Sequence, residues 1–128
     1  MSKQSVLIVE DNPINLKLVQ VLLSKEGYEV YTAANAEEAL MLLKSKHPTL
    51  ILMDLQLPGM DGLQLTRLLK NNPETNDIII LALTAYAMKG DAEKALEAGC
   101  DGYISKPIDT QTFPDLIQQM LTNSVARR

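Results

Sequence analysis

The sequence predicts an α/β domain in which one parallel β-sheet is covered by helices on both faces. Two apolar runs, Leu50–Met53 and Ile78–Leu83, contain no alternating polar residues, which is typical of strands buried on both faces. Such runs alternate with helix-like segments along the chain, and this alternation favours parallel strands joined by crossover helices. The 128 residues have the length of one domain, and 46% of them are apolar, which is enough for a single core.

The first half of the chain carries start and stop signals for two strands and two helices. Asn12-Pro13 offers an N-cap followed by proline at the first helical position, and Gly27 is a typical helix C-cap. Asn35, with a glutamate three residues later, forms a capping-box pattern for the second helix. The expected elements are a strand over 5–9, a helix over 13–26, a strand over 28–33, and a helix from 36 to a stop at His47-Pro48.

The second half begins with the central strand, whose apolar run ends on the carboxylate of Asp54. A loop containing Pro58-Gly59 follows, and breaker-rich residues 71–73 end the next helix. Pro114 is compatible only with the first turn of the last helix, where its missing N–H has no intrahelical partner. The expected elements are strands over 50–54, 78–83 and 102–104, helices over 62–70, 87–98 and 112–122, and a frayed tail over 123–128.

Five strands alternating with five helices give a (βα)5 pattern. Parallel crossovers are right-handed almost without exception, so the helices coat both faces of the sheet. The common doubly wound solution at this size is the flavodoxin-like strand order 2-1-3-4-5. No repeat, low-complexity run or domain boundary interrupts the pattern, so residues 1–128 are predicted to form one domain with its core over about 4–122.

Composition narrows the function classes and the compartment. A net charge of −4 and a pI near 4.9 argue against nucleic-acid binding, which needs a basic face. No apolar stretch reaches the ~18 residues of a membrane span, and the N-terminus has no signal-peptide architecture. The single cysteine, Cys100, permits no internal disulfide and suits a reducing compartment. We therefore expect a cytoplasmic protein with neither nucleic-acid nor membrane partners.

Four of the predicted strands end at polar residues of distinct kinds. They are Glu10-Asp11 after the first strand, Asp54 at the end of the third, Thr84 after the fourth and Lys106 soon after the fifth. The C-terminal ends of parallel strands share one edge of the sheet, where open α/β sheets bind their ligands. Three carboxylates, a hydroxyl and an ammonium are therefore expected to meet in one shallow pocket.

Carboxylates gathered in this way need a cation. Two like charges ~4 Å apart repel by about 4 kcal/mol at an effective dielectric of about 20, so one carboxylate would otherwise take up a proton. Oxygen ligands favour a hard divalent ion, and a few carboxylates with waters is how Mg²⁺ is usually held. The predicted Mg²⁺ ligands are Asp11 and Asp54 directly, Glu10 directly or through water, and the backbone carbonyl of Gln56.

Mg²⁺ beside a free carboxylate oxygen, a lysine and a threonine hydroxyl is an arrangement for phosphoryl transfer. Catalysis of that reaction is mostly positioning and electrostatic stabilisation, and an aspartyl phosphate is a known covalent route. In this interpretation Asp54 attacks the phosphoryl group, Mg²⁺ and Lys106 neutralise its oxygens, and Thr84 hydrogen-bonds one of them.

Five short motifs are specific only in combination. They are Val-Glu-Asp at 9–11, Met-Asp at 53–54, Leu-Pro-Gly-Met-Asp-Gly at 57–62, Leu-Thr-Ala at 83–85 and Lys-Pro at 106–107. With these motifs the chain resembles the receiver domain of two-component response regulators, and the resemblance covers residues 4–122. Ala-Tyr-Ala-Met-Lys-Gly-Asp at 85–91 is most similar to stand-alone receivers of the cell-division type and to receivers of hybrid kinases.

The resemblance implies a signalling switch rather than an enzyme. Asp54 is then the phosphoacceptor, supplied by a histidine kinase or a histidine phosphotransfer protein, and the domain assists its own phosphorylation and dephosphorylation. Thr84 and Tyr103 are the implied switch pair, which reshapes the face of the fourth helix, fifth strand and fifth helix and so alters binding of a downstream target. The bond between Lys106 and Pro107 is implied to be cis, a form that only X-Pro bonds adopt cheaply.

Two departures from the family pattern bear on the site and on assembly. Glu10 stands where many receivers have aspartate, and its longer side chain should tolerate the change. The last helix lacks the charged pattern of transcription-factor receivers that dimerise through their fourth and fifth helices, so a monomer or weak dimer is expected. Asn15 and Leu18, early in the first helix beside the pocket mouth, are predicted to contact a partner protein.

Three other functions fit parts of the pattern. A phosphohydrolase of the haloacid-dehalogenase kind also uses Asp, Thr and Lys, but it needs a second acid two residues after its nucleophile, where this chain has Gln56. A flavin mononucleotide carrier has a similar fold, yet Glu10-Asp11 would repel the phosphate. A degenerate receiver acting only as a scaffold is disfavoured because every pocket residue is present. Turnover of p-nitrophenyl phosphate would favour the first alternative, and a yellow preparation the second.

Overall fold

In the computed structural model, which describes residues 4–57, 59–84 and 89–126, five strands alternate with five helices. The strands are β1 (Ser5–Val9), β2 (Glu29–Ala33), β3 (Leu50–Asp54), β4 (Ile79–Thr84) and β5 (Gly102–Ser105). The helices are α1 (Pro13–Lys25), α2 (Ala36–Leu43), α3 (Gly62–Lys70), α4 (Lys89–Ala98) and α5 (Phe113–Ala126).

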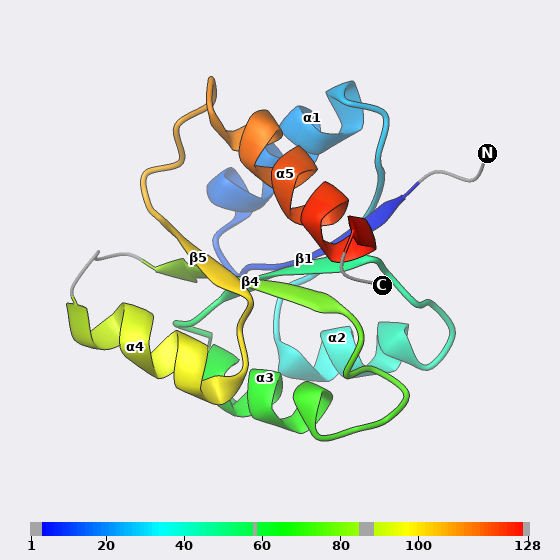
Figure 1. The fold of residues 1–128 in the computed structure, drawn as a ribbon, viewed down its shortest axis with the longest axis vertical. Coiled ribbons are helices and arrows are strands. Elements are labelled where there is room, and N and C mark those ends of the chain that lie inside the picture. The colour runs from blue at the N-terminus through cyan, green and yellow to red at the C-terminus, as the bar shows by residue number, and fades with distance from the viewer. Residues whose placement is uncertain (1–3, 58, 85–88, 127–128) are drawn as a thin grey trace.

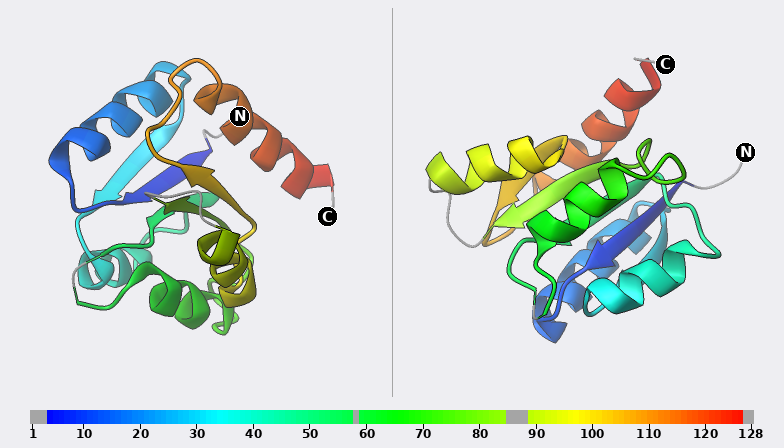
Figure 2. Two further views of the ribbon diagram at one scale, coloured as in Figure 1. Left: turned by 90° about the vertical axis from the view of Figure 1, so that its left-hand side faces the viewer. Right: turned by 90° about the horizontal axis from the view of Figure 1, so that it is seen from below.

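The strands form one parallel sheet of order β2-β1-β3-β4-β5, which confirms the predicted topology. α1 and α5 cover one face of this sheet, and α2, α3 and α4 cover the other (Figures 1 and 2). Because every strand runs in the same direction, the C-terminal ends of all five lie along one edge of the sheet.

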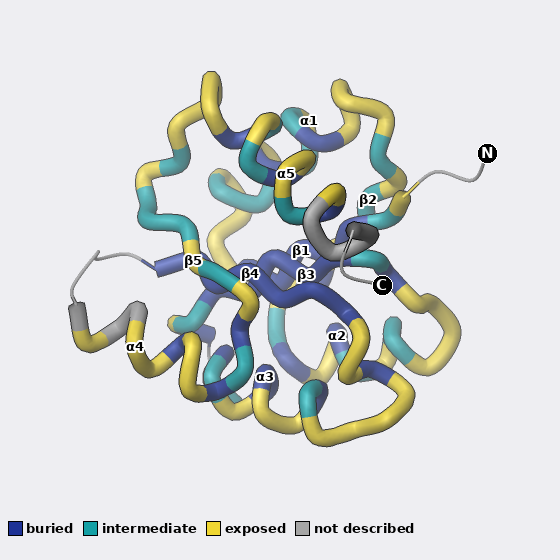
Figure 3. Tube along the Cα trace, viewed as in Figure 1, coloured by how far each residue is buried: buried dark blue, intermediate teal, exposed yellow. Residues whose placement is uncertain are grey.

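The two central strands are the most deeply buried elements. Every residue of β3 and β4 is buried, whereas the outer faces of the surrounding helices are exposed (Figure 3). Side chains alternate between the faces of β3, so that Ile51 and Met53 pack on the side of α2, α3 and α4, and Leu50 and Leu52 on the side of α1 and α5. None of the described helices combines the length and the apolar character needed to cross a membrane.

Side-chain caps start two of the helices that follow the C-terminal edge. The Asn12 side-chain oxygen accepts hydrogen bonds from the backbone N–H groups of Ile14 and Asn15, at 2.9 and 3.2 Å. The Asp61 carboxylate accepts one from the backbone N–H of Gln64 at 2.8 Å. Each cap satisfies N–H groups that have no partner within the helix, and it fixes the point at which the loop from the preceding strand ends.

Two element boundaries correct the sequence predictions. α2 ends at Leu43, before the predicted stop at His47-Pro48, because the backbone N–H groups of Lys44 and Ser45 bond to the carbonyls of Met41 and Leu42, which tightens the last turn. α5 continues to Ala126, so residues 123–126 are helical rather than a frayed tail; no glycine or proline stands there to end the helix. The predicted start of α4 at Ala87 lies outside the described residues, and the other boundaries agree within two residues.

Candidate functional site

Residues from several strand ends meet at the C-terminal edge of the sheet. Glu10 follows β1, Asp54 closes β3, and Lys106 follows β5. The Lys106 ammonium lies 3.0 Å from a Glu10 carboxylate oxygen and 3.3 Å from Asp54 Oδ2. One cation is therefore shared between two carboxylates that come from distant parts of the chain.

Asp11 adds a third carboxylate to this group. One oxygen each from Glu10, Asp11 and Asp54 lies within 4.8 Å of the others. Glu10 and Asp54 are buried, while Asp11 is exposed at the rim. Oxygen donors alone, with two buried and one open to solvent, fit the preference of Mg²⁺ for carboxylates combined with water.

The charges at this site are unevenly balanced. Burial raises the pKa of Glu10, and the hydrogen bond from Lys106 opposes that rise without cancelling it, in part because Asp54 lies close by. Burial lowers the pKa of Lys106, but its hydrogen bonds and attraction to Glu10 and Asp54 outweigh this, so its pKa lies above the ordinary value. The pair therefore favours the charged form of Lys106, whereas burial disfavours the charged form of Glu10.

The loop after β3 holds the Asp54 carboxylate in place. Asp54 Oδ1 accepts a hydrogen bond from the Gln56 backbone N–H at 2.9 Å, and Oδ2 accepts one from Lys106 at 3.3 Å. The Leu55 N–H donates to the Leu83 carbonyl at 3.2 Å, which ties this loop to β4. The predicted role of the Gln56 carbonyl as a metal ligand stays a prediction.

Thr84 ends β4, the strand between β3 and β5. Thr84 is 3% exposed, and its hydroxyl oxygen is buried with no hydrogen-bond partner within the described part of the chain. A buried hydroxyl without a partner is unfavourable, so this atom can still donate a hydrogen bond beyond those found in the described part of the chain. The Thr84 carbonyl accepts a hydrogen bond from the Lys106 N–H at 2.7 Å, and the bond between Lys106 and Pro107 is cis.

Tyr103 points outward from β5. It is 46% exposed, and no hydrogen bond joins it to Thr84 among the described residues. It lines a groove of about 270 Å³ between β5 and α5, together with Pro107, Phe113 and Leu116. The predicted switch residues therefore lie on neighbouring strands, Thr84 buried and Tyr103 exposed, and their role as a switch pair stays a prediction.

The two residues predicted to contact a partner lie on α1. Asn15 is half-buried, and Leu18 is 37% exposed. Sequence reasoning missed Ile14 and Val21 on the same helix, which are 79% and 50% exposed. Their spacing from Leu18, four residues before it and three after it, is the signal that could have identified this exposed apolar stripe.

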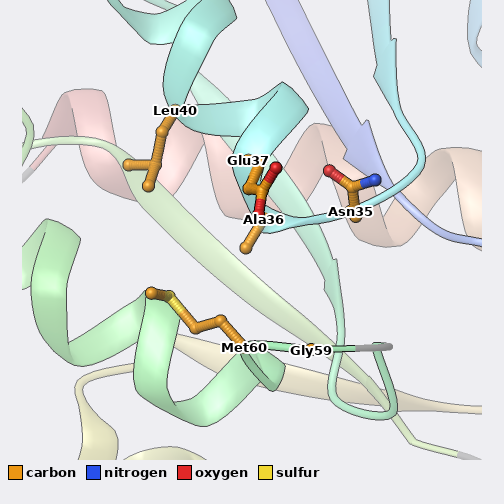
Figure 4. Close-up of a pocket in the computed structure, with 6 residues that line it drawn as sticks. All are labelled: Asn35, Ala36, Glu37, Leu40, Gly59 and Met60. Carbon is orange, nitrogen blue, oxygen red and sulfur yellow. The ribbon is translucent and has the colours of Figure 1, made fainter.

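A second hollow lies beside the site without including its acidic residues. This pocket of about 290 Å³ separates the start of α2 from Gly59 and Met60 of the loop after β3, and Ala36 and Leu40 of α2 face it (Figure 4). The carboxylates of Glu10, Asp11 and Asp54 do not line it. On this side Gly59 and Met60 line the pocket, although Met60 also packs against the hydrophobic core.

Comparison with known proteins gives one family. A family model for the response regulator receiver domain matches residues 6–118. The chain is 47% identical over 118 residues to the polar-differentiation response regulator DivK of Brucella ovis, with 92% of this chain and 96% of that protein covered.

Two solved structures share the fold along their whole length. The receiver domain of a sensor histidine kinase from Pseudomonas aeruginosa is 33% identical, with a TM-score of 0.86 over 94% of this chain and 99% of that one. That structure has a magnesium ion coordinated in its active-site cleft. A receiver domain protein from Methanospirillum hungatei is 30% identical, with a TM-score of 0.90 over 99% of this chain and 100% of that one.

Proposed function

Because this chain belongs to the response regulator receiver domain family, we propose that it is a phosphoacceptor signalling switch in which Asp54 receives the phosphoryl group. One observation carries the proposal: the Lys106 ammonium bridges Glu10 and Asp54 at the edge of the sheet. The neighbouring strand ends at Thr84, whose buried hydroxyl has no partner among the residues that the structure describes. A transferring phosphoryl group needs a nucleophile, a cation and hydrogen-bond donors for its oxygens, and these residues are of that kind.

Three carboxylates are the proposed holders of Mg²⁺. Glu10, Asp11 and Asp54 would bind the ion, with the backbone carbonyl of Gln56 as a further ligand. When bound, Mg²⁺ supplies positive charge to the phosphoryl oxygens and to the crowded carboxylates. The magnesium ion in the receiver domain of the Pseudomonas kinase supports this assignment.

Asp54 is the proposed nucleophile and Lys106 its electrostatic partner. An Asp54 oxygen forms a bond to phosphorus while the bond from phosphorus to a histidine nitrogen of the donor breaks, and the histidine keeps that electron pair. The donor is a histidine kinase or a histidine phosphotransfer protein. The Lys106 ammonium, already 3.3 Å from Asp54 Oδ2, stabilises the charge on a phosphoryl oxygen. The same groups assist later hydrolysis, which resets the switch.

The proposed output is a change on the face made by α4, β5 and α5. The Thr84 hydroxyl hydrogen-bonds the phosphoryl group, and Tyr103 turns inward into the space that the threonine leaves. The exposed position of Tyr103 beside the groove between β5 and α5 supports this, because it leaves the ring free to move. Coupling of ~1–3 kcal/mol is enough to change the affinity for a downstream protein by about 5- to 150-fold.

The phosphodonor is proposed to dock on α1. Asn15 and Leu18 lie at the start of this helix, and the exposed side chains of Ile14 and Val21 extend the same apolar stripe. An apolar stripe on a helix suits contact with another helix. We place the protein in the cytoplasm, working through protein contacts as a monomer or weak dimer.

Labelling with a small phosphodonor tests this function. Wild-type protein with acetyl phosphate and Mg²⁺ should gain one phosphoryl group by intact mass, and Asp54→Asn should gain none. Asp77→Asn is the matched control, since Asp77 pairs with His47 at the opposite end of the sheet and should label normally. Labelling that survives in Asp54→Asn would refute the assignment.

The switch itself is tested by a partner. Beryllofluoride mimics the phosphoryl group on aspartate, so a pull-down with and without it should retain different proteins on the wild-type chain. The difference should vanish in Asp54→Asn. Identical retention by the wild type in both conditions would leave phosphorylation without an output and would count against the switch.

A further inference from the structure

Gly62, the first residue of α3, lies against the backbone of Asp54. Its backbone is not in the left-handed region, so it is not glycine for conformational reasons. A Cβ atom at this position would collide with the Asp54 carbonyl oxygen and would lie 2.8 Å from the Leu55 Cα. Glycine is needed here for space.

The atoms that a side chain would strike cannot swing aside. Both belong to the backbone that carries the Asp54 carboxylate. That backbone is tied to β4 through the Leu55 N–H, and its carboxylate is oriented by the Gln56 N–H at 2.9 Å. The Gly62 N–H donates to the Leu55 carbonyl at 3.3 Å, which closes the loop onto itself. Any displacement of the peptide after Asp54 therefore moves its carboxylate relative to Lys106.

The first turn of α3 is held firmly from its other side. The fully buried Thr66 hydroxyl donates to the Gly62 carbonyl at 2.8 Å, and the Asp61 cap fixes the residue before. Farther along the loop, Gly59 and Met60 line the pocket beside α2, and Met60 packs against the core (Figure 4). The contact at Gly62 is thus the place where the helix sets the position of the loop.

We propose that Gly62 is a positioning residue for phosphoryl transfer. Its missing side chain lets the first turn of α3 seat the Asp54 backbone, which places the carboxylate for attack beside Lys106. The inference rests on the proposed function, since it concerns the rate at which Asp54 is phosphorylated. A misplacement of about 1 Å can cost a reaction up to about 100-fold.

Gly62→Ala is the direct test, with two readouts. The rate of labelling at saturating acetyl phosphate and Mg²⁺ should fall by about 10- to 100-fold, while the concentration of acetyl phosphate giving half the maximal rate stays unchanged. The amide resonance of Gln56 should also shift, because it reports the hydrogen bond to the Asp54 carboxylate. A merely structural role would leave both readouts as they are in folded protein.

Two controls isolate the contact. Gly90→Ala adds the same methyl group to α4, where none of the described atoms lies within 4 Å of the new Cβ, and should label like the wild type. Ile78→Val removes one methylene from the core at the far end of the sheet and so lowers stability without touching the loop. It should leave the rate and the Gln56 resonance unchanged.

The outcomes separate this inference from the proposed function. If the wild type labels and folded Gly62→Ala labels equally fast, the positioning role is wrong and the switch stands. If the wild type does not label, the proposed function fails, and an unshifted Gln56 amide in Gly62→Ala overturns the positioning role as well. If Gly62→Ala does not fold, Asp61→Ala, which removes the cap beside Gly62, replaces it. Labelling of Asp61→Ala about threefold slower than that of Ile78→Val supports the positioning role, and equal labelling overturns it.

Discussion

Lys70 and Lys106 lie at opposite ends of the same sheet, and each is paired with acidic residues. Lys70, at the end of α3, donates to Asp101 at 3.0 Å and to the Ile78 carbonyl at 2.8 Å. Asp101 also accepts from the Ile80 N–H at 2.9 Å, so one cation meets one anion and the backbone completes the bonding. This arrangement joins α3, β4 and the start of β5.

Lys106 has no such balance. It is shared by Glu10 and Asp54, both almost fully buried, with Asp11 close by at the rim. The hydroxyl of Thr84 is left without a partner among the described residues. The comparison teaches that the same kind of ion pair can complete its own bonding at one end of the sheet and leave anions and a donor available for a further group at the other.

The largest expected effect comes from removing the shared cation. Lys106→Met should slow labelling of Asp54 by acetyl phosphate at least about 100-fold, equivalent to about 2.7 kcal/mol, because the developing charge on the phosphoryl oxygens loses its partner. Lys70→Met, the same substitution at the balanced end, should label at the wild-type rate. Equal labelling rates for Lys106→Met and Lys70→Met would show that the two lysines do not differ in their effect on phosphorylation.

Lys70→Met should instead act on stability. It leaves Asp101 and the Ile78 carbonyl without their cation, so the free energy of unfolding should fall by about 2 kcal/mol. Urea denaturation measures this directly. A loss no larger than that of an exposed surface variant such as Lys44→Met would show that the pair contributes little.

Mg²⁺ should stabilise the folded protein only by binding at the Lys106 end of the sheet. At a concentration ten times its Kd, the ion should raise the free energy of unfolding by about 1.4 kcal/mol. Thermal melts with Mg²⁺ or with a chelator would show this gain in the wild type and in Lys70→Met, but not in Asp11→Asn. A gain of the same size in Asp11→Asn would place the ion elsewhere.

The smallest effect is a pH-dependent gain from Glu10→Gln. Burial raises the pKa of Glu10 in the folded state. The folded protein therefore loses stability when Glu10 is ionised, at pH values above its ordinary pKa, and this loss is absent at pH values below that pKa. In the absence of divalent cations, the variant should be more stable than the wild type by on the order of 1 kcal/mol at pH 7. The difference should shrink as the pH falls through the raised pKa of Glu10. A stability difference that grows as the pH falls would show that the folded state lowers the pKa of Glu10 instead of raising it.

Sequence patterns predicted the fold because several independent signals agreed. The aliphatic runs of β3 and β4, the alternation of strands and helices, and the caps at Asn12 and Asn35 all favoured the same set of elements. The end of α2 was predicted wrongly. His47-Pro48 is a strong stop signal, but the helix ends earlier in a turn of backbone hydrogen bonds, and such a turn has no characteristic residue type.

The sequence could predict which residues meet at the candidate site, but not how their charges and hydrogen bonds are matched. Chain order and strand polarity bring Glu10, Asp54 and Lys106 to one edge, so their meeting follows from topology alone. Two features depend on side-chain packing, which sequence patterns do not encode: the Thr84 hydroxyl, without a partner in the described ranges, and the outward position of Tyr103. The close approach of Gly62 to the Asp54 backbone is likewise a matter of three-dimensional fit.

The order in which the chain supplies the site has a consequence for a newly made protein. The acids and the threonine come from β1, β3 and β4, whereas Lys106 follows β5, the strand at the sheet's far edge. Chains emerge from the ribosome N-terminus first, so the negative groups exist long before the positive one. A copy synthesised only as far as β4 therefore lacks the cation that pairs with Glu10 and Asp54, and these ion pairs form only after Lys106 has emerged.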